Sequence, residues 1–233
     1  MDARAVDFGT HAPQLVGSLD AGASSGGLSV GDCRLNLFRI LALCLVAAAL
    51  PGCALLGGGG SAPVDTFELG AASPEPAGPR RSRVQVLIAE PSALKSLDSE
   101  NIVIKPSSAE VQYLKGAQWA DRLPKVVQSK LAQAFQSSGR FGGVGKPGEG
   151  LAIDFQVVTE IRSFEVRLDG QDRAEVELFV RILNDRNGTV RAAQAFTASS
   201  PLTGTANADY TAALDRAFRQ VSADIVDWSV RRM

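Results

Sequence analysis

The sequence has no excess of charge of either sign. It carries 24 lysines and arginines against 25 aspartates and glutamates in 233 residues. Proteins that bind nucleic acids usually need a basic excess to neutralise phosphate groups, so the balance argues against a nucleic-acid partner. Hydrophobic residues make up 45% of the chain, the usual share for a globular domain with a buried core.

Histidine and cysteine are scarce, and neither occurs after residue 53. The single histidine is His11, and the cysteines are Cys33, Cys44 and Cys53. The chain beyond Cys53 can therefore form no disulfide, and it lacks the commonest general base and metal ligand. It also contains no Gly-x-Ser-x-Gly nucleophile motif and no pair of carboxylates whose spacing suggests acid–base work. The sequence predicts a protein that is not an enzyme and has no metal or cofactor.

A targeting segment is present near the N-terminus. Arg34 and Arg39 supply the basic start of a secretory signal, and Ile40–Leu50 supplies its apolar run. Residues 50–53, Leu-Pro-Gly-Cys, then match a bacterial lipobox. In that motif the cysteine thiol receives a diacylglycerol, and cleavage frees the cysteine amine for a further acyl chain such as palmitate. Cys53 is therefore the predicted lipidation site.

The alternative for the same segment is an uncleaved membrane helix. Its apolar run, Ile40–Leu56, is interrupted by Pro51 and Gly52, and its length is at the lower limit for a membrane span. The lipobox therefore favours a cleaved signal and an acyl anchor. Two or more acyl chains hold a protein stably at a membrane, whereas one holds it only marginally.

The chain is predicted to have four parts. Residues 1–31 form a disordered extension or a mis-assigned start, and residues 32–52 form the lipoprotein signal peptide. Residues 53–63 form the lipidated cysteine and a glycine-rich flexible tether. Since ten extended residues reach at most about 35 Å, the tether keeps the following domain, residues 64–233, near the membrane.

Hydrophobic periodicity predicts the elements of the domain. Period-two alternation from Leu151 onward changes parity near Arg162, which indicates a β-bulge, and Asp169-Gly170 and Asn187-Gly188 mark turns between three antiparallel strands. One helix is expected to begin with Pro124 in its first turn and to end at Gly139. The remaining expected elements are short strands at 65–69, 84–89, 102–104 and 110–114, and a last helix over about 207–231.

The expected fold is α+β, with an antiparallel sheet of about five to six strands and two main helices packed on one face. Residues 141–150, FGGVGKPGEG, are expected to form a loop. Their glycines invite comparison with a phosphate-binding loop. However, no serine or threonine follows Lys146, and the segment follows a helix instead of a strand. A phosphate site is therefore not predicted.

One segment carries a resemblance to a known family. Tyr113 is followed by Trp119-Ala120-Asp121 and then by Leu123-Pro124 at the start of a predicted helix. This pattern, with the lipobox and the long C-terminal helix, resembles the ABC-type transport auxiliary lipoproteins, the group that contains the paraquat-inducible lipoprotein. The resemblance covers the chain from Cys53 to its end.

The resemblance implies an accessory part in an envelope lipid-transport system. The implied partners are an MCE-domain protein and its ABC permease and ATPase, and the membrane is contacted through the anchor on Cys53. Ala54 follows the lipidated cysteine; an aspartate there is the usual inner-membrane retention signal, so an outer-membrane, periplasm-facing location is expected. Self-association into a homo-oligomer is left open.

The residues of the shared segment are the candidates for partner binding. They are Tyr113, Trp119, Asp121, Leu123 and Pro124. The competing interpretation is that the aromatic residues pack the first helix onto the sheet and that Asp121 is a helix N-cap.

Two other functions remain open from the sequence. A regulatory lipoprotein that activates a peptidoglycan synthase would have to reach through the cell wall, which usually needs a longer tether. A periplasmic carrier that binds lipid itself would need an apolar cavity between its helices and its sheet.

Overall fold

The computed structural model describes residues 63–73 and 78–233. These residues belong to one compact unit, Ser61–Met233. The predictions for residues 1–62, which include the signal peptide, Cys53 and most of the tether, lie outside the described residues. Within the described part of the chain, no helix has the length and apolar character that a membrane span requires.

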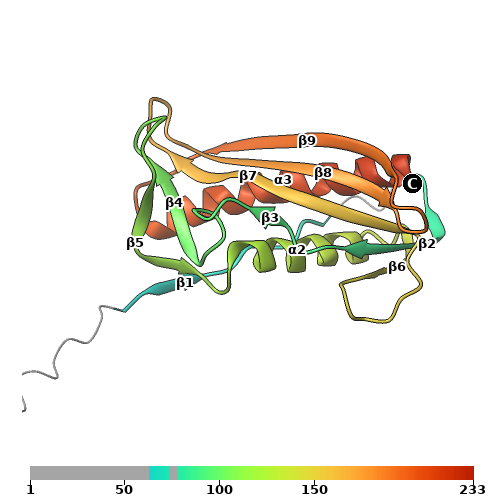
Figure 1. Cartoon of the computed structure of the whole chain (residues 1–233). Coiled ribbons are helices and arrows are strands. Elements are labelled where there is room, and N and C mark those ends of the chain that lie inside the picture. The colour runs from blue at the N-terminus through green and yellow to red at the C-terminus, as the bar shows by residue number, and fades with distance from the viewer. Residues whose placement is uncertain (1–62, 74–77) are drawn as a thin grey trace, which may run out of the picture. The chain divides into compact units, whose positions relative to one another are not determined.

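The described residues form one mixed sheet and two long helices (Figure 1). The elements, in chain order, are β1 Asp65–Phe67, β2 Arg81–Ile88, β3 Ser92–Ala93, β4 Asn101–Lys105, β5 Gln112–Trp119, α2 Leu123–Ser137, β6 Phe141–Gly145, β7 Phe155–Arg167, β8 Arg173–Asn184, β9 Val190–Pro201 and α3 Asn207–Arg232.

The α+β class is confirmed, but the predicted sheet is wrong in size and direction. The sheet has nine strands, and only the β4–β5, β7–β8 and β8–β9 pairs are antiparallel. One edge of β7 is shared in turn by β2, β3 and β4, each of which runs parallel to it. Crossover connections bring these short strands into the sheet parallel to β7. The alternation of residues within one strand does not reveal which distant strand it pairs with, or in which direction.

The three-stranded meander is confirmed in detail. β7, β8 and β9 pair in sequence, and the register of β7 against β8 shifts between Ile161 and Ser163, which confirms the bulge near Arg162. The turns contain Gly170 and Gly188, both with positive φ. Because the bulge reverses the parity of β7, Ile161 and Phe164 both lie in the core although three positions separate them.

The expectation of a loop at residues 141–150 is wrong for its first half. Residues 141–145 form the edge strand β6, which pairs parallel to β2. A Cβ atom at Gly142 would lie 2.4 Å from the carbonyl oxygen of Ser82 on β2. Glycine at this position therefore permits the close approach of β6 to β2. The prediction was wrong because it took the glycines of this segment as a sign of a loop.

Helix α2 begins and ends as predicted. A proline occupies its first turn, and its C-terminus is followed by Gly139, which has φ +60° and donates its backbone N–H to the Gln136 carbonyl at 3.1 Å. The N-cap is Arg122 and makes no side-chain capping bond, so the prediction that Asp121 is the N-cap is wrong.

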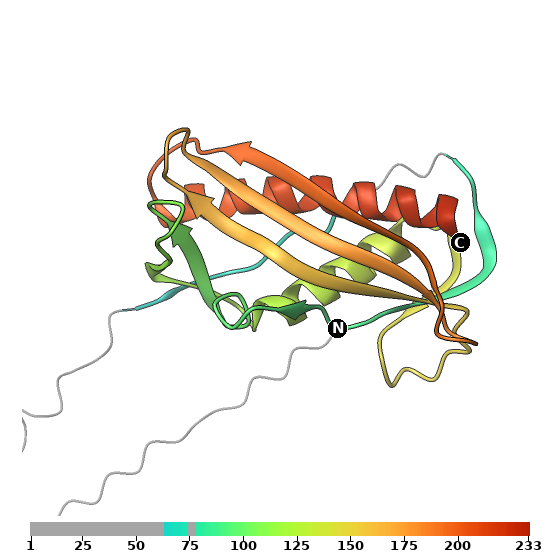
Figure 2. The ribbon, with the colours of Figure 1, turned by 45° about the horizontal axis from the view of Figure 1, so that its top comes forward.

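Helix α3 confirms the predicted last helix within one residue at its C-terminus. The predicted apolar stripe faces the sheet: Leu214, Ala217, Val221, Ile225 and Trp228 are buried, and Tyr210 is partly buried. Both helices lie on the same side of the sheet (Figure 2). α3 packs on β7, β8 and β9, α2 packs on β2 and β6, and the helices contact each other. The core fills the space between these two layers.

Candidate partner-binding surface

The segment that carries the family resemblance lies at one end of the sheet. It comprises β5, which pairs with β4 on one side and with β1 on the other, and the beginning of α2 (Figure 1). β1 covers only residues 117–119 of β5. Among the described residues, the first half of β5 therefore has no strand on its second side.

Trp119, at the end of β5, is part of the core. Only 1% of its surface is exposed, and its ring meets that of Phe164 edge to face at 5.7 Å. Its backbone N–H donates to the Glu100 carbonyl at 2.7 Å. The burial places this tryptophan in the core, where its ring contacts β7, and leaves the side chain no free surface for a partner.

Leu123 and Pro124 continue this buried stretch into α2. Both are buried, and the Leu123 N–H donates to the Ser99 carbonyl at 3.0 Å. Arg122, between strand and helix, donates through Nε to Asp98 at 2.8 Å and through Nη1 to Glu90 at 3.3 Å. The hydrogen bond with Asp98 raises the pKa of Arg122 above its ordinary value. These contacts fix where α2 begins.

Tyr113 is the exposed aromatic residue of the segment. It leaves 49% of its surface exposed, and Val111, just before β5, leaves 46%. Tyr113 lies opposite Val103 of β4. Further along β5, the Lys115 carbonyl accepts from Asn207 at the start of α3 at 3.2 Å. An aromatic side chain thus stands on a stretch of β5 that has β4 on one side and no strand among the described residues on the other. We call this stretch the β5 edge surface, residues 111–115.

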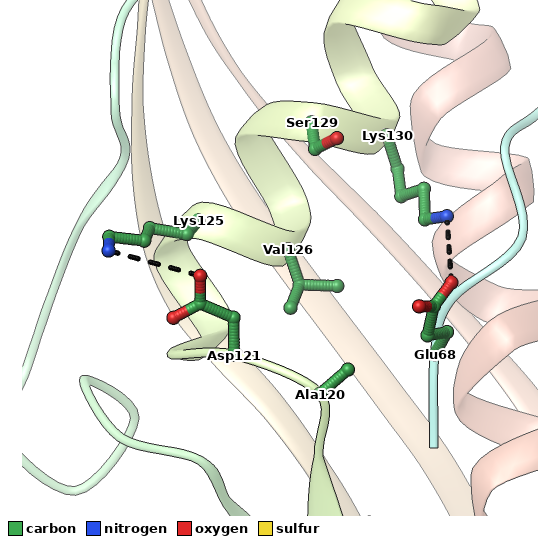
Figure 3. Close-up of a pocket in the computed structure, with 7 residues that line it drawn as sticks. All are labelled: Glu68, Ala120, Asp121, Lys125, Val126, Ser129 and Lys130. Atoms are coloured by element: carbon green, nitrogen blue, oxygen red, sulfur yellow. Dashed lines mark hydrogen bonds and ion pairs between the residues drawn. The ribbon is translucent and has the colours of Figure 1, made fainter. Parts of the chain in front are cut away.

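Asp121 lies at a small hollow beside this end of the sheet (Figure 3). The hollow has a volume of about 250 Å³. Two ion pairs border it: Lys125 with Asp121 at 3.8 Å, and Lys130 with Glu68 at 3.4 Å. The hollow is smaller than a usual small-molecule site and its charges balance. Its lining residues are Glu68, Ala120, Asp121, Lys125, Val126, Ser129 and Lys130.

Two buried charged groups were not predicted from the sequence. Glu165 on β7 has 3% of its side chain exposed and pairs with Lys105 at 3.0 Å and with Arg167 at 3.4 Å. Arg140, with 2% of its side chain exposed, pairs with Asp227 of α3 and donates to the Pro79 carbonyl at 3.3 Å. Each joins segments far apart in the chain, so no local pattern could have identified it.

The described residues offer no constellation for metal chemistry. No three His, Cys, Asp or Glu side chains among them are placed to hold a metal. Five surface hollows within residues 68–231 each include charged side chains in their linings.

Comparison with known proteins gives the family. A family model described as the ABC-type transport auxiliary lipoprotein component matches residues 67–226. The chain belongs to this family. The match runs from the end of β1 into α3, and so includes the whole sheet except the start of β1. The description of the family names an auxiliary lipoprotein component of ABC-type transport.

The auxiliary lipoprotein fold is also present in solved structures. Protein XCC0632 from Xanthomonas campestris, of the DUF330 family, is 29% identical with a TM-score of 0.68, covering 72% of this chain and 96% of that one. An uncharacterized protein at 16% identity and a TM-score of 0.56 covers 72% of this chain and 99% of its own, and shares the fold alone.

One curated relative matches this chain in sequence. The uncharacterized protein bll6063 of Bradyrhizobium diazoefficiens is 28% identical over 174 residues, which is 74% of this chain and 47% of the relative. The chain thus spans about half the length of that relative.

Proposed function

We propose that this auxiliary lipoprotein serves an MCE-type lipid transporter in the bacterial envelope and acts by binding partner proteins. The observation that carries the proposal is the family match over residues 67–226. The partners that we propose are the MCE-domain protein that carries lipid and, with it, the ABC permease and ATPase.

The β5 edge surface is the proposed docking site. Tyr113 supplies a large, half-exposed aromatic side chain, the type most often found in the energetic centre of a protein interface. The neighbouring main chain has no second strand among the described residues, so its N–H and C=O groups suit a partner that adds a strand. Asp121, at the nearby hollow, is the proposed polar contact at the rim.

The buried members of the shared segment support this surface from below. Trp119, Leu123 and Pro124 lie in the core and hold β5 against α2. Their proposed contribution to partner binding is therefore indirect, through the position of Tyr113. Residues of this kind affect binding only when their loss distorts the strand.

An acyl anchor on Cys53 is the proposed attachment to the membrane. The lipobox at residues 50–53 and the absence of an aspartate at position 54 support an outer-membrane anchor that faces the periplasm. Intact mass of the mature protein tests the anchor. Cleavage before Cys53 with an added diacylglyceryl group is the expected result, and a Cys53→Ser chain that is retained uncleaved is the matching control.

The experiment that tests the docking proposal is recovery of partners from solubilised envelope membranes. The lipidated chain should recover an MCE-domain protein, and Tyr113→Ala should recover about tenfold less of it, as expected for an interfacial aromatic anchor. Leu94→Ala is the matched control, because Leu94 is also an exposed apolar residue, at 72%, but lies outside the β5 edge surface. Recovery of other proteins without any MCE-domain protein would contradict the proposal.

A further inference from the structure

A second surface lies at the end of the sheet opposite Tyr113. There the start of β2, the turn between β8 and β9 and the C-terminal end of α3 come together (Figure 2). These segments carry a group of arginines that we call the arginine end: Arg80, Arg81, Arg83, Arg186, Arg191, Arg231 and Arg232.

Contacts between segments connect members of the arginine end. Arg81 donates through Nε to the Val230 carbonyl at 3.0 Å, and Arg191 donates to the Arg232 carbonyl at 3.3 Å. Arg83 and Arg186 line one hollow. Three separate segments of the chain therefore bring their guanidinium groups to the same end of the fold.

Helix capping explains only part of this group. Arginines near the last carbonyls of a helix interact favourably with its dipole, which accounts for one N–H each of Arg81 and Arg191. Six of the seven arginines are exposed, and Arg81 is half-buried. Capping of the helix therefore does not account for the other guanidinium N–H groups of these arginines.

Acidic residues at this end, among them Asp224 in a hollow with Arg231, are fewer than the arginines and offset part of their charge. Asp154 pairs with Arg186 at 3.3 Å and accepts the Gln85 N–H at 3.0 Å. Asp185 accepts from Gln156, and Asp227 pairs with the buried Arg140. A chain with 24 basic and 25 acidic residues thus concentrates positive charge at one end.

From this surface we infer that the arginine end binds the anionic headgroups of a phospholipid bilayer. The guanidinium group matches phosphate oxygens in a bidentate geometry that lysine cannot provide. Each basic residue near an anionic membrane contributes about 1 kcal/mol of attraction. Val190, 55% exposed beside Arg191, supplies an apolar contact of the kind that enters the headgroup boundary.

A bilayer fits this surface better than an acidic protein does. Protein interfaces usually depend on exposed aromatic anchors, and the large, exposed aromatic side chain of the described residues is Tyr113, at the opposite end. The inference also rests on the proposed function in one respect. An acyl anchor would hold the domain beside a bilayer at high effective concentration, so weak attraction suffices.

The test uses the unlipidated domain beginning at Ser61, so that the anchor cannot contribute. This chain retains the whole core, whose residues lie between Leu69 and Trp228. It should sediment with phosphatidylcholine vesicles that contain phosphatidylglycerol, and not with pure phosphatidylcholine vesicles. High ionic strength should release it, because screening weakens attraction between surface charges.

Two matched triple variants locate the site. Arg80→Glu, Arg83→Glu and Arg186→Glu together should weaken vesicle binding about 100-fold, from about 1 kcal/mol per residue. Lys95→Glu, Arg162→Glu and Arg219→Glu make the same change in net charge at exposed positions outside both proposed surfaces and should weaken it by about twofold at most. Thermal unfolding of both variants checks that the fold is kept.

The outcomes separate this inference from the proposed function. Absence of binding to the anionic vesicles, equal binding to neutral ones, or equal losses in the two variants would overturn the inference. If the wild-type domain ignores vesicles while the arginine variant loses the MCE-domain protein, the arginine end binds protein and the inference fails, although the proposed function stands. Vesicle binding that the arginine variant alone loses supports the inference whether or not an MCE-domain protein is recovered.

Discussion

Two residues of β5 illustrate how one strand can serve both the core and the surface. Trp119, at its end, is 1% exposed and meets Phe164, whereas Tyr113, near its beginning, is 49% exposed. Both belong to the segment that resembles the auxiliary lipoproteins. The difference arises because the pairing of β5 with β4 changes register between Tyr113 and Gln118, around Gly116 with its positive φ. Leu114 faces the core before this irregularity, and Trp119 faces the core after it. A shared motif therefore combines residues with different physical roles.

Removal of the buried residue should have the largest effect. Trp119→Ala should lower the free energy of unfolding by about 3 to 5 kcal/mol, because it removes a large aromatic side chain from a packed core. The midpoint of urea unfolding measures this. Trp119→Phe keeps an aromatic ring and should cost less. A loss below about 1 kcal/mol for the alanine variant would contradict the packing role.

The second effect concerns a buried charge beside the same end of the sheet. Glu165→Ala leaves Lys105 of β4 without its carboxylate partner and should destabilise the protein by about 2 to 3 kcal/mol. Fully buried pairs cost more, but Lys105 keeps 23% of its side chain exposed.

Glu177→Ala is the control for that change. Glu177 is a more exposed glutamate that pairs with Arg162 at 3.6 Å, and its loss should cost about 0 to 1 kcal/mol. Equal losses in the free energy of unfolding for the two variants would show that the contribution of Glu165 to stability does not depend on its burial.

The third effect should appear in binding and not in stability. Tyr113→Ala should change the free energy of unfolding by no more than about 0.5 kcal/mol, as is usual for exposed positions. Partner recovery should nevertheless fall about tenfold. The two measurements together sharpen the contrast with Trp119. If Tyr113→Ala unfolds the protein as readily as Trp119→Ala does, the comparison between core and surface is wrong.

The smallest effect is electrostatic. A hydrogen bond from Arg167 lowers the pKa of Asp169, in the turn after β7, below its ordinary value. The ionised carboxylate therefore stabilises the fold above the unfolded-state pKa, and this contribution is lost as the pH falls through the lower folded-state pKa. Arg167→Gln should return the pKa of Asp169 toward its ordinary value in a carboxyl NMR titration. An unchanged titration would contradict the assignment.

The sequence predicted those parts of the fold that depend on neighbouring residues. The meander, its bulge near Arg162 and the ends of α2 follow from alternation, turn glycines and the proline and glycine at the helix termini. The parallel pairings of β1, β2, β3, β4 and β6 depend on which distant segments meet. β6 was missed because glycines in a sequence usually indicate a loop. Here Gly142 instead allows β6 to approach Ser82 of β2 closely.

The site was predictable only as a segment. The pattern around Tyr113 and Trp119 identified the region, but which aromatic residue is exposed depends on the register shift in the pairing of β5 with β4. The arginine end shows the same limit. Arg83, Arg186 and Arg232 are scattered along a chain of balanced charge, and only folding brings them to one end.

Site-specific photo-crosslinking from position 113 tests the central claim most directly. A photoreactive residue that replaces Tyr113 in the lipidated chain should crosslink to the MCE-domain protein in envelope membranes. The same residue at position 94, which is exposed but lies outside the β5 edge surface, should not. Crosslinks to the MCE-domain protein from position 94 alone, or from neither position, would contradict the account.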